Sequence, residues 1–231
     1  MSTSFKVFGT NALRTALLSR LPAFERAHGL KVGAAIEFNA TNHTLAAMRA
    51  GATADVVIAT AGAIDTLVEE GKIVRGTRTD LATAGIGACV RAGAPKPDIS
   101  TVEALKRALL AAKSVSYSQA GQSGIHFAKV IDQLGIGDAV RAKAVINASG
   151  LVGERIVRGD AELGFQQVSE LLAVEGIDLV GPLPDAVQLN SLFAAGIGAG
   201  TQHAALAREF IDDLRSPDAA AVMRASGLTP V

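Results

Sequence analysis

Short polar side chains gather where strand-like runs of this sequence are followed by helix-like runs. In EFNATNHTLAAMR, the run that ends at Phe38 is followed by Thr41, Asn42 and His43, and then by a helical pattern. In an open α/β sheet, ligands bind beyond the carboxyl ends of the strands, where the helices begin. A helix start carries free N–H groups and about half a positive charge, so it can bind an anion without lysine or arginine. The chemistry these residues suggest is therefore anion capture.

The same pattern recurs in both halves of the chain. The other candidates are Thr10 and Asn11 in FGTNALR, Ser118, Gln119 and Ser123 in YSQAGQSGIHF, Asn147 and Ser149 in NASGLVGE, and the pair Gln166 and Gln167 that ends ELGFQQ. Gly124 and other glycines at these places permit a close approach of the backbone. Helix capping alone explains any one of these residues. Because a buried, unpaired glutamine is costly, we expect the two glutamines to face solvent or a ligand.

The elements that position these residues alternate between strand and helix. The apolar patterns predict strands at 5–8, 34–38, 56–59, 81–91, 115–118, 144–147, 163–166 and 189–197. They predict helices at 11–28, 44–50, 64–70, 124–134, 151–158, 202–214 and 217–225. A further helix is expected to start at Ser100 or Thr101, where Glu103 could form a capping box with Ser100. Such an order is typical of an α/β fold with open sheets.

Two long apolar runs, near 81–91 and 187–198, bracket the second half of the chain. We interpret them as crossing strands that join two open α/β lobes, lobe 1 from 1–83 plus 192–231 and lobe 2 from 84–191. A cleft between the lobes would then be lined by polar helix starts from both sides. The alternative is one doubly wound domain of this size.

Composition excludes several classes of function. The chain has 22 Lys and Arg residues against 22 Asp and Glu, and aromatics make up 4%, so no nucleic-acid partner is expected. No segment approaches the roughly 18 apolar residues of a membrane span, and the N-terminus has no signal-peptide pattern. We expect no membrane insertion. As written the sequence reads as cytoplasmic, and a removed leader would make the protein periplasmic. The single cysteine, Cys89, is expected to be a buried, reduced residue.

The order of motifs resembles the periplasmic solute-binding proteins of type II topology, most closely their molybdate-binding branch. The segments that carry the resemblance are VFGTNALRTALLSRLPAFERAHG, NATNHTLAAMRAGATADVVIATA, SGIHFAKVIDQLG, GERIVRGDAELGFQQ and LRSPDAAAVMRASGLTP. Together they span nearly the whole chain. The resemblance implies a bilobal fold that closes on a small anion and, as partner, an ABC transporter permease.

Carried over by position, the resemblance implies ligand contacts at Asn11, at Thr41 or Asn42, at Ser123, near Ser149 and at Gln167. Thr10, His43 and Gly124 lie beside them and complete the expected ligand site. The molybdate binders tend to have serine at the first two sites and tyrosine at the last. The amide and imidazole side chains of this chain suit carboxylates better than a compact tetrahedral oxyanion.

A second resemblance in fold is to the aconitate isomerases, which interconvert cis- and trans-aconitate. An allylic proton shift needs an acid or base beside the substrate, and histidine can exchange protons near neutral pH. His43 and His126 lie beside the proposed ligand positions, one in each predicted lobe. If the protein is an isomerase, they are the candidate catalytic residues. Otherwise they are ordinary polar residues of a loop and a first helical turn.

The sequence contains no phosphate-binding loop, dinucleotide fingerprint, HExxH or GxSxG motif. We therefore expect no cofactor and no metal. Our main hypothesis is a monomeric binding protein that captures a small oxyanion or carboxylate in the cleft. The alternative hypothesis is an isomerase of the aconitate type that acts on a small polycarboxylate.

Overall fold

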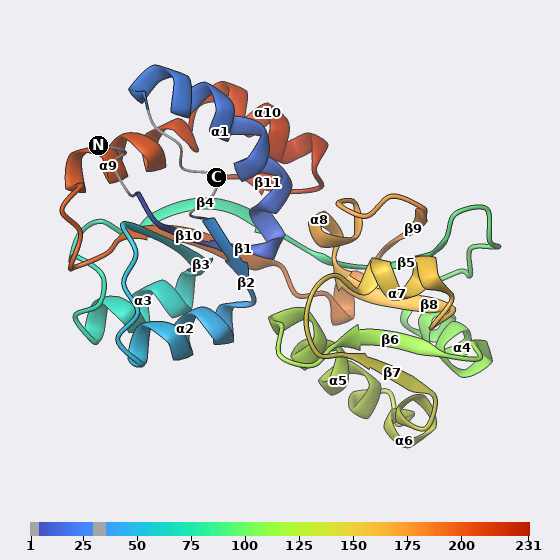
Figure 1. The fold of residues 1–231 in the computed structure, drawn as a ribbon. Helices are drawn as coiled ribbons and strands as arrows, with labels where there is room; N and C mark the ends of the chain where they lie inside the picture. Colours follow the sequence, from blue (N-terminus) through green and yellow to red (C-terminus); the bar gives the residue numbers. More distant parts are fainter. Residues whose placement is uncertain (1–4, 30–35) are drawn as a thin grey trace. The chain divides into compact units, whose positions relative to one another are not determined.

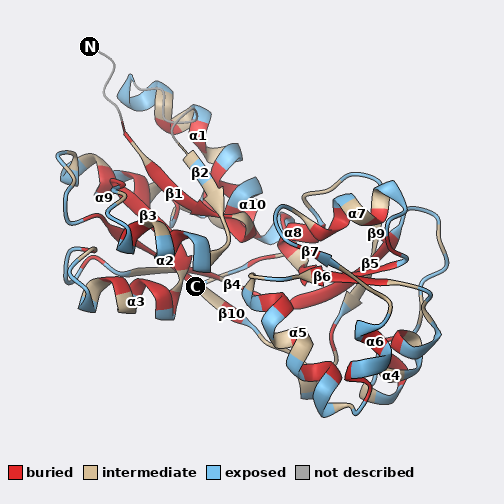
Figure 2. Cartoon of the chain, turned by 60° about the horizontal axis from the view of Figure 1, so that its bottom comes forward, coloured by how far each residue is buried: buried red, intermediate tan, exposed pale blue. Residues whose placement is uncertain are grey.

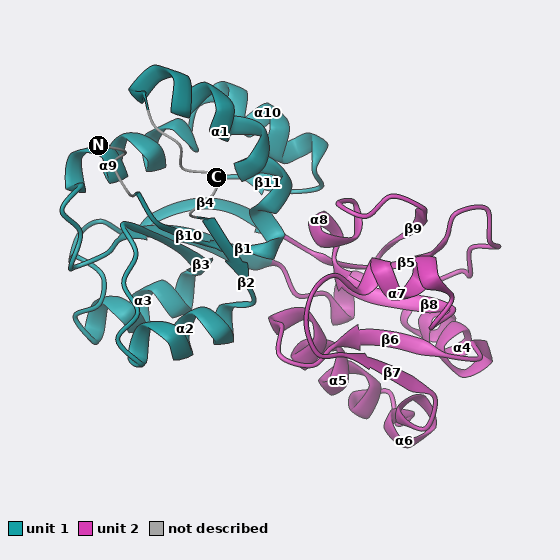
Figure 3. Cartoon of the chain, viewed as in Figure 1, with its two compact units in different colours: residues 1–83, 191–231 teal, residues 84–190 magenta. Residues whose placement is uncertain are grey.

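The computed structural model describes residues 5–29 and 36–231, and the chain folds into two compact units. Unit 1 comprises Met1–Thr83 and Ser191–Val231, and unit 2 comprises Ala84–Asn190 (Figure 3). The chain passes between the units twice, after Thr83 and after Asn190. Each unit contains its own sheet with helices packed on it, so the α/β prediction is confirmed.

The sheet of unit 1 has the strand order β11-β4-β10-β3-β1-β2. β1 pairs in parallel with β2 on one side and β3 on the other, and β10 pairs antiparallel with β3. The strands are β1 (Val7–Thr10), β2 (Ile36–Asn39), β3 (Val56–Thr60), β4 (Thr79–Ala84), β10 (Ser191–Ile197) and β11 (Thr229–Pro230). The first two residues of the expected strand at 34–38 lie outside the described residues.

Helices cover both faces of this sheet: α1, α9 and α10 lie on one face, and α2 and α3 on the other (Figure 1). Their bounds are α1 (Arg14–His28), α2 (Thr41–Arg49), α3 (Ala61–Glu69), α9 (Ala204–Asp213) and α10 (Pro217–Ala225), and a 3-10 turn, η1 (Asn11–Leu13), precedes α1. The strands that carry the candidate site, β1 and β3, are the buried centre of the unit (Figure 2).

The sheet of unit 2 has the order β7-β6-β8-β5-β9. β6 pairs in parallel with β7 and β8, whereas β5 pairs antiparallel with β8 and β9. The strands are β5 (Ile86–Arg91), β6 (Val115–Ser118), β7 (Ala144–Asn147), β8 (Leu163–Gln167) and β9 (Ile177–Pro182). The sequence pattern did not predict β9.

The helices of unit 2 are α4 (Val102–Ala111), α5 (Gln122–Gln133), α6 (Gly137–Arg141), α7 (Val152–Arg158) and α8 (Val168–Leu171), followed by the 3-10 turn η3 (Asp185–Val187). Alternate residues of β5 point to opposite faces of the sheet and pack into two different hydrophobic clusters. Ile86, Ala88 and Val90 pack with α4, α5 and α6, whereas Cys89 packs with Ile156 of α7. Burial raises the pKa of the Cys89 thiol to about 12, which fits the expectation of a buried, reduced residue.

Two further differences from the expected elements occur at turns. The apolar run at 81–91 is two strands rather than one, because β4 ends at Ala84 and β5 starts at Ile86. α4 is capped by Thr101, whose side chain accepts the Ala104 N–H, while Ser100 bonds Asp98 instead. The proposed capping box between Ser100 and Glu103 is therefore wrong.

Candidate functional site

The carboxyl ends of three parallel strands meet at one edge of the unit 1 sheet. β1 lies between β2 and β3, Thr10 and Asn39 are register partners at the ends of β1 and β2, and Thr60 ends β3. η1, α2 and α3 begin at or next to these ends (Figure 1). The N–H groups of helix starts therefore gather at this edge, which is the arrangement that favours an anion.

Two threonines at this edge do not cap the helices that follow them. Thr10 and Thr60 are the N-cap residues of η1 and α3, and neither side chain accepts a helix N–H. Elsewhere in the chain Thr101 and Ser216 do cap, for α4 and α10. The capping interpretation is therefore wrong for Thr10. Thr60 was missed by the sequence analysis, although IATAGA repeats the strand-then-threonine pattern of FGTNAL.

The polar cluster after β2 lies inside the first turn of α2 rather than before it. The N-cap is Ala40, so Thr41 and Asn42 are the first two helical residues and do not cap this helix. The Thr41 hydroxyl oxygen accepts the backbone N–H of Thr60 at 3.4 Å, which joins the starts of α2 and α3. Thr41 is half-buried, and Asn42 and His43 are exposed. The structure thus brings Thr41 next to Thr60, as the sequence alone could not show.

A cation lies beside this edge. The guanidinium carbon of Arg14, the first residue of α1, lies 4.6 Å from the ring centroid of Phe38, the penultimate residue of β2. Phe38 in turn packs over Gly9, where an added Cβ would meet the ring at 3.1 Å. Arg14 is exposed and forms no ion pair with any residue that the structure describes. Sequence spacing gave no signal for this pair.

In unit 2, β7, β6 and β8 also run parallel, and their ends carry Ser118, Asn147 and Gln167. The Ser118 hydroxyl accepts the Gly121 N–H at 2.9 Å and so shapes the turn before α5. Ser123 is buried in the first turn of α5. Gly124 packs against the Ser118 carbonyl, because an added Cβ would lie 1.7 Å from that oxygen. The turn requires glycine here whether or not a ligand binds.

The loop after β7 is held by its own side chains. Asn147 is buried, donates to the Gly150 carbonyl at 3.0 Å and accepts from the Arg155 Nε at 3.0 Å. Arg155 also pairs with Asp160 at 3.5 Å. Asn147 therefore supports the loop, and Ser149 is an exposed polar side chain that the loop presents.

The two glutamines at the end of β8 are both buried, with 3% of each exposed. Oε1 of Gln166 accepts the Val152 N–H at 2.7 Å, so Gln166 caps α7 from the neighbouring strand. The expectation that Gln166 faces solvent or a ligand is wrong. Gln167 is the N-cap residue of α8. Burial raises the pKa of the nearby Glu170 to about 7, even though the Gln167 N–H and the Gln166 side chain stabilise the ionised carboxylate.

The two candidate catalytic histidines differ in their surroundings. Nε2 of His126, in the first turns of α5, lies 2.9 Å from the Val187 carbonyl oxygen. A carbonyl can only accept, so Nε2 carries a proton and the neutral ring has its lone pair on Nδ1. His43 is exposed at the start of α2. Each lies in a different unit, and each is near the end of a parallel strand.

Comparison with known proteins adds to this geometry. A model of the family described as bacterial extracellular solute-binding protein matches residues 5–229. The chain belongs to this family. An aconitate isomerase from Pseudomonas sp is 37% identical to it over 233 residues, which cover 99% of this chain and 88% of that relative.

Solved structures show that this solute-binding protein shares its fold with other members of the class. The periplasmic molybdate-binding protein of Azotobacter vinelandii has a TM-score of 0.80 at 20% identity and covers 98% of this chain and 99% of its own. The sulfate-binding protein SubI of Mycobacterium tuberculosis H37Rv has a TM-score of 0.73 at 17% identity, with coverages of 99% and 87%. The type II periplasmic-binding fold expected from the sequence is thereby confirmed.

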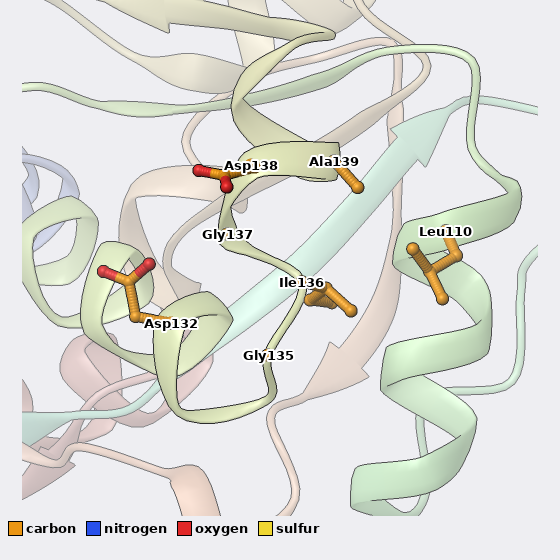
Figure 4. Close-up of a pocket in the computed structure, with 7 residues that line it drawn as sticks. All are labelled: Leu110, Asp132, Gly135, Ile136, Gly137, Asp138 and Ala139. Atoms are coloured by element: carbon orange, nitrogen blue, oxygen red, sulfur yellow. The ribbon is translucent and has the colours of Figure 1, made fainter.

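Unit 2 of this solute-binding protein also contains a cavity of about 500 Å³ near the connection between α5 and α6. Figure 4 shows the carboxylates of Asp132 and Asp138 on one side of this connection and Leu110 on the other. Because α5 begins at the carboxyl end of β6 and runs back along the sheet, the cavity lies toward the opposite edge. Its two carboxylates are paired with Arg141, which lies 2.6 Å from Asp132 and 3.8 Å from Asp138, so among the residues that the structure describes the cavity offers an anion no unpaired cation, and the anion site is not assigned to it.

Within residues 5–29 and 36–231, no three His, Cys, Asp or Glu side chains are grouped so that they could hold a metal ion. No helix in the same part of the chain is long and apolar enough to cross a membrane.

Proposed function

We propose that this protein captures a small polycarboxylate anion at the carboxyl edges of its parallel strands. The observation that carries the proposal is the pair of threonines at the edge of unit 1. Thr10 and Thr60 are N-cap residues that do not cap, beside Thr41 and the start of α2. Helix N-termini supply N–H donors and a favourable dipole, and the hydroxyls add donors that the helices do not use.

A carboxylate ligand fits the donor set better than a tetrahedral oxyanion. Asn11 and Asn42 carry amide groups, which can both donate to a carboxylate and accept from a hydroxyl or a protonated acid. Arg14, held over Phe38, supplies a cation for a second carboxylate. An arginine fork matches a carboxylate with two parallel hydrogen bonds.

The comparisons support an anionic ligand of this kind. The relative at 37% identity is an aconitate isomerase, whose substrate is a tricarboxylate. The structural neighbours include proteins described as binding molybdate and sulfate, and a PEB3 structure with bound L-phospholactate. At these low identities the neighbours support the fold, so the ligand class rests on the isomerase relative and on the donors. An ABC transporter permease is the partner that such a capture protein would serve.

A second candidate function, isomerisation of the captured polycarboxylate, is favoured by the same relative. In an allylic shift, a base removes a proton from one end of a three-carbon unit, the double bond moves, and a proton is returned to the other end. Substrate and product have the same formula, so no oxidant or cofactor is needed. His43 and His126 are the candidates for this transfer.

Thermal melting against an anion panel tests the proposal. The panel is molybdate, tungstate, sulfate, phosphate, citrate, cis-aconitate and trans-aconitate. A ligand at 100 times its Kd stabilises the native state by about 2.7 kcal/mol, which raises Tm by roughly 5–10 °C for a chain of this size. We expect citrate or an aconitate to give this shift. A shift with molybdate, tungstate or sulfate alone would overturn the polycarboxylate assignment.

Ultraviolet absorbance separates capture from catalysis, because cis- and trans-aconitate absorb differently. Turnover that is lost in H43A or H126A while binding remains would support the isomerase. Tight binding without interconversion would support capture only.

A further inference from the structure

Glu170 is a buried carboxylate that the proposed function does not yet use. It lies on α8, directly after the end of β8, and 9% of its surface is exposed. Its carboxylate accepts hydrogen bonds from the Gln167 backbone N–H and from the Gln166 side chain. A buried ionised carboxylate is costly unless such donors compensate for the lost water.

These contacts connect Glu170 to the start of α7. The Gln166 amide donates to Glu170, while its Oε1 accepts the Val152 N–H at 2.7 Å. The chain of contacts therefore runs from a carboxylate through an amide to the first N–H of a helix. It fixes the orientation of Gln166 and the backbone of Gln167 at the same edge as Ser118 and Ser123.

No charged side chain pairs with Glu170 among the residues that the structure describes. The elements packed against α8 are β5, α7, β8 and β9. Their titratable and charged residues are Cys89 and Arg91 on β5, Glu154, Arg155 and Arg158 on α7, and Asp178 on β9. Arg155 and Arg158 pair with Asp160, Asp178 accepts the Gly93 N–H, and Glu154 and Arg91 are exposed. The charge of Glu170 is therefore balanced only by neutral donors.

We propose that Glu170 is a positioning residue of the anion site and that anion binding at the end of β8 is linked to proton uptake by Glu170. The inference rests on the proposed function and on the ligand position that the family resemblance implies at Gln167, the residue that ends β8. An anion bound near Gln167 repels the ionised carboxylate across a poorly screened interior, so binding favours the protonated form. By linkage, protonation of Glu170 raises affinity for the anion by the same factor.

The pKa of Glu170, raised to about 7 by burial, places this exchange in an accessible pH range. Above that pH the carboxylate is ionised and opposes the anion. Below it the neutral acid still accepts from one donor and no longer repels the ligand.

Isothermal titration calorimetry with trans-aconitate tests the linkage at pH 6.5, 7.5 and 8.5. From pH 6.5 to pH 8.5, we expect the ratio of the wild-type Kd to the Kd of Glu170→Gln, the neutral isostere, to rise by about three- to tenfold. Comparing the two proteins at each pH removes the titration of the ligand, which is the same in both experiments. Repeating the titration in buffers of different ionisation enthalpy should show net proton uptake in the wild type and less in Glu170→Gln. The control is Glu175→Gln, which removes one exposed carboxylate and should behave like the wild type.

The outcomes separate the inference from the function. Binding by the wild type with the same pH dependence in Glu170→Gln would overturn the linkage and leave the polycarboxylate site intact. Failure of the wild type to bind trans-aconitate, citrate or cis-aconitate at any pH would overturn the proposed function, and the linkage with it. If Glu170→Gln did not fold, the wild type and Glu175→Gln would decide the question at pH 7.5. Equal net proton uptake by these two proteins on binding would support the linkage. No proton uptake by the wild type would overturn it.

Discussion

Oε1 of Gln166 accepts the backbone N–H of Val152 at 2.7 Å, so a strand-end side chain caps a helix that begins 14 residues earlier. This contact satisfies the start of α7 from within the protein. The starts of η1 and α3 have no such cap, because Thr10 and Thr60 do not bond to their own helices. Two kinds of helix start therefore occur at the carboxyl edges of the sheets, and the uncapped kind is the one suited to a ligand.

Replacing Gln166 by leucine should destabilise the protein. The change leaves the Val152 N–H without its acceptor and removes one donor from Glu170, both in a buried environment. An unsatisfied buried polar group costs about 1–3 kcal/mol, so the free energy of unfolding should fall by at least this amount in urea titrations. The control is Gln133→Leu at the exposed end of α5, which should change the free energy of unfolding by less than about 0.5 kcal/mol. Equal effects of the two would contradict the capping role.

The Glu170 carboxyl should make folding stability depend on pH. Its folded pKa of about 7 is raised above the ordinary value of 4.5, so the native state binds the proton more tightly than the unfolded chain does. Its contribution to stability is full below pH 4.5 and is lost as pH rises through 7. The loss is about 3 kcal/mol, from the size of the shift. Urea unfolding at pH 5 and pH 8 should show most of this loss in the wild type but not in Glu170→Gln, and a parallel pH response of both proteins would contradict it.

The order of elements could be predicted from the sequence because buried strands and amphipathic helices have local patterns. β6 and β7 were predicted with the bounds that the structure gives, and α10 likewise. β9 was not predicted, because its residues are half-buried at the sheet edge and follow no strong alternation. The strand break at Gly85 was missed because both flanking runs are apolar.

The candidate site was less predictable, because its decisive contacts join residues distant in sequence. A polar residue after a strand could be found, but its partner could not. Thr41 meets Thr60, Arg14 meets Phe38, and Gln166 meets Val152 only through the fold. Glu170 gave no signal, because an acidic residue in a short helix is ordinarily exposed. The roles of Asn11, Ser149 and the other ligand positions stay predictions.

Gly124 should not tolerate a side chain. An alanine Cβ there would lie 1.7 Å from the Ser118 carbonyl oxygen, which belongs to the backbone and cannot rotate away. We expect Gly124→Ala to lower the free energy of unfolding by about 1–3 kcal/mol or more. At Gly62 in α3, an added Cβ meets no atom within 4 Å. Gly62→Ala should therefore raise the free energy of unfolding by about 0.5–1 kcal/mol, because alanine favours the helix. Thermal melting of the pair checks this contrast, and a stable Gly124→Ala protein would show that the turn can open.

Arg14→Gln should weaken ligands with several carboxylates more than ligands with one. The guanidinium over Phe38 is proposed to meet a second carboxylate, and a hydrogen bond to a charged group contributes about 1.5–3 kcal/mol. We expect the Kd for citrate or trans-aconitate to rise about 10- to 100-fold by calorimetry. Arg26→Gln, at the exposed end of the same helix, removes the same charge and should leave affinity unchanged. If both variants weakened binding equally, a general electrostatic effect would replace the specific contact.

Thr60 and Thr101 offer the sharpest contrast between binding and capping. Both are threonine N-cap residues, but only Thr101 accepts a helix N–H, that of Ala104 at 3.1 Å. Thr101→Val should therefore lower the free energy of unfolding by about 1 kcal/mol and leave affinity for trans-aconitate unchanged. Thr60→Val should change stability by less than about 0.5 kcal/mol and raise the Kd about three- to tenfold, the effect of one lost hydrogen bond. Urea unfolding and calorimetry on the two variants measure both quantities. If Thr60→Val lost stability and kept its affinity, the hydroxyl at the end of β3 would be structural, and the anion site would have to be sought at another strand end.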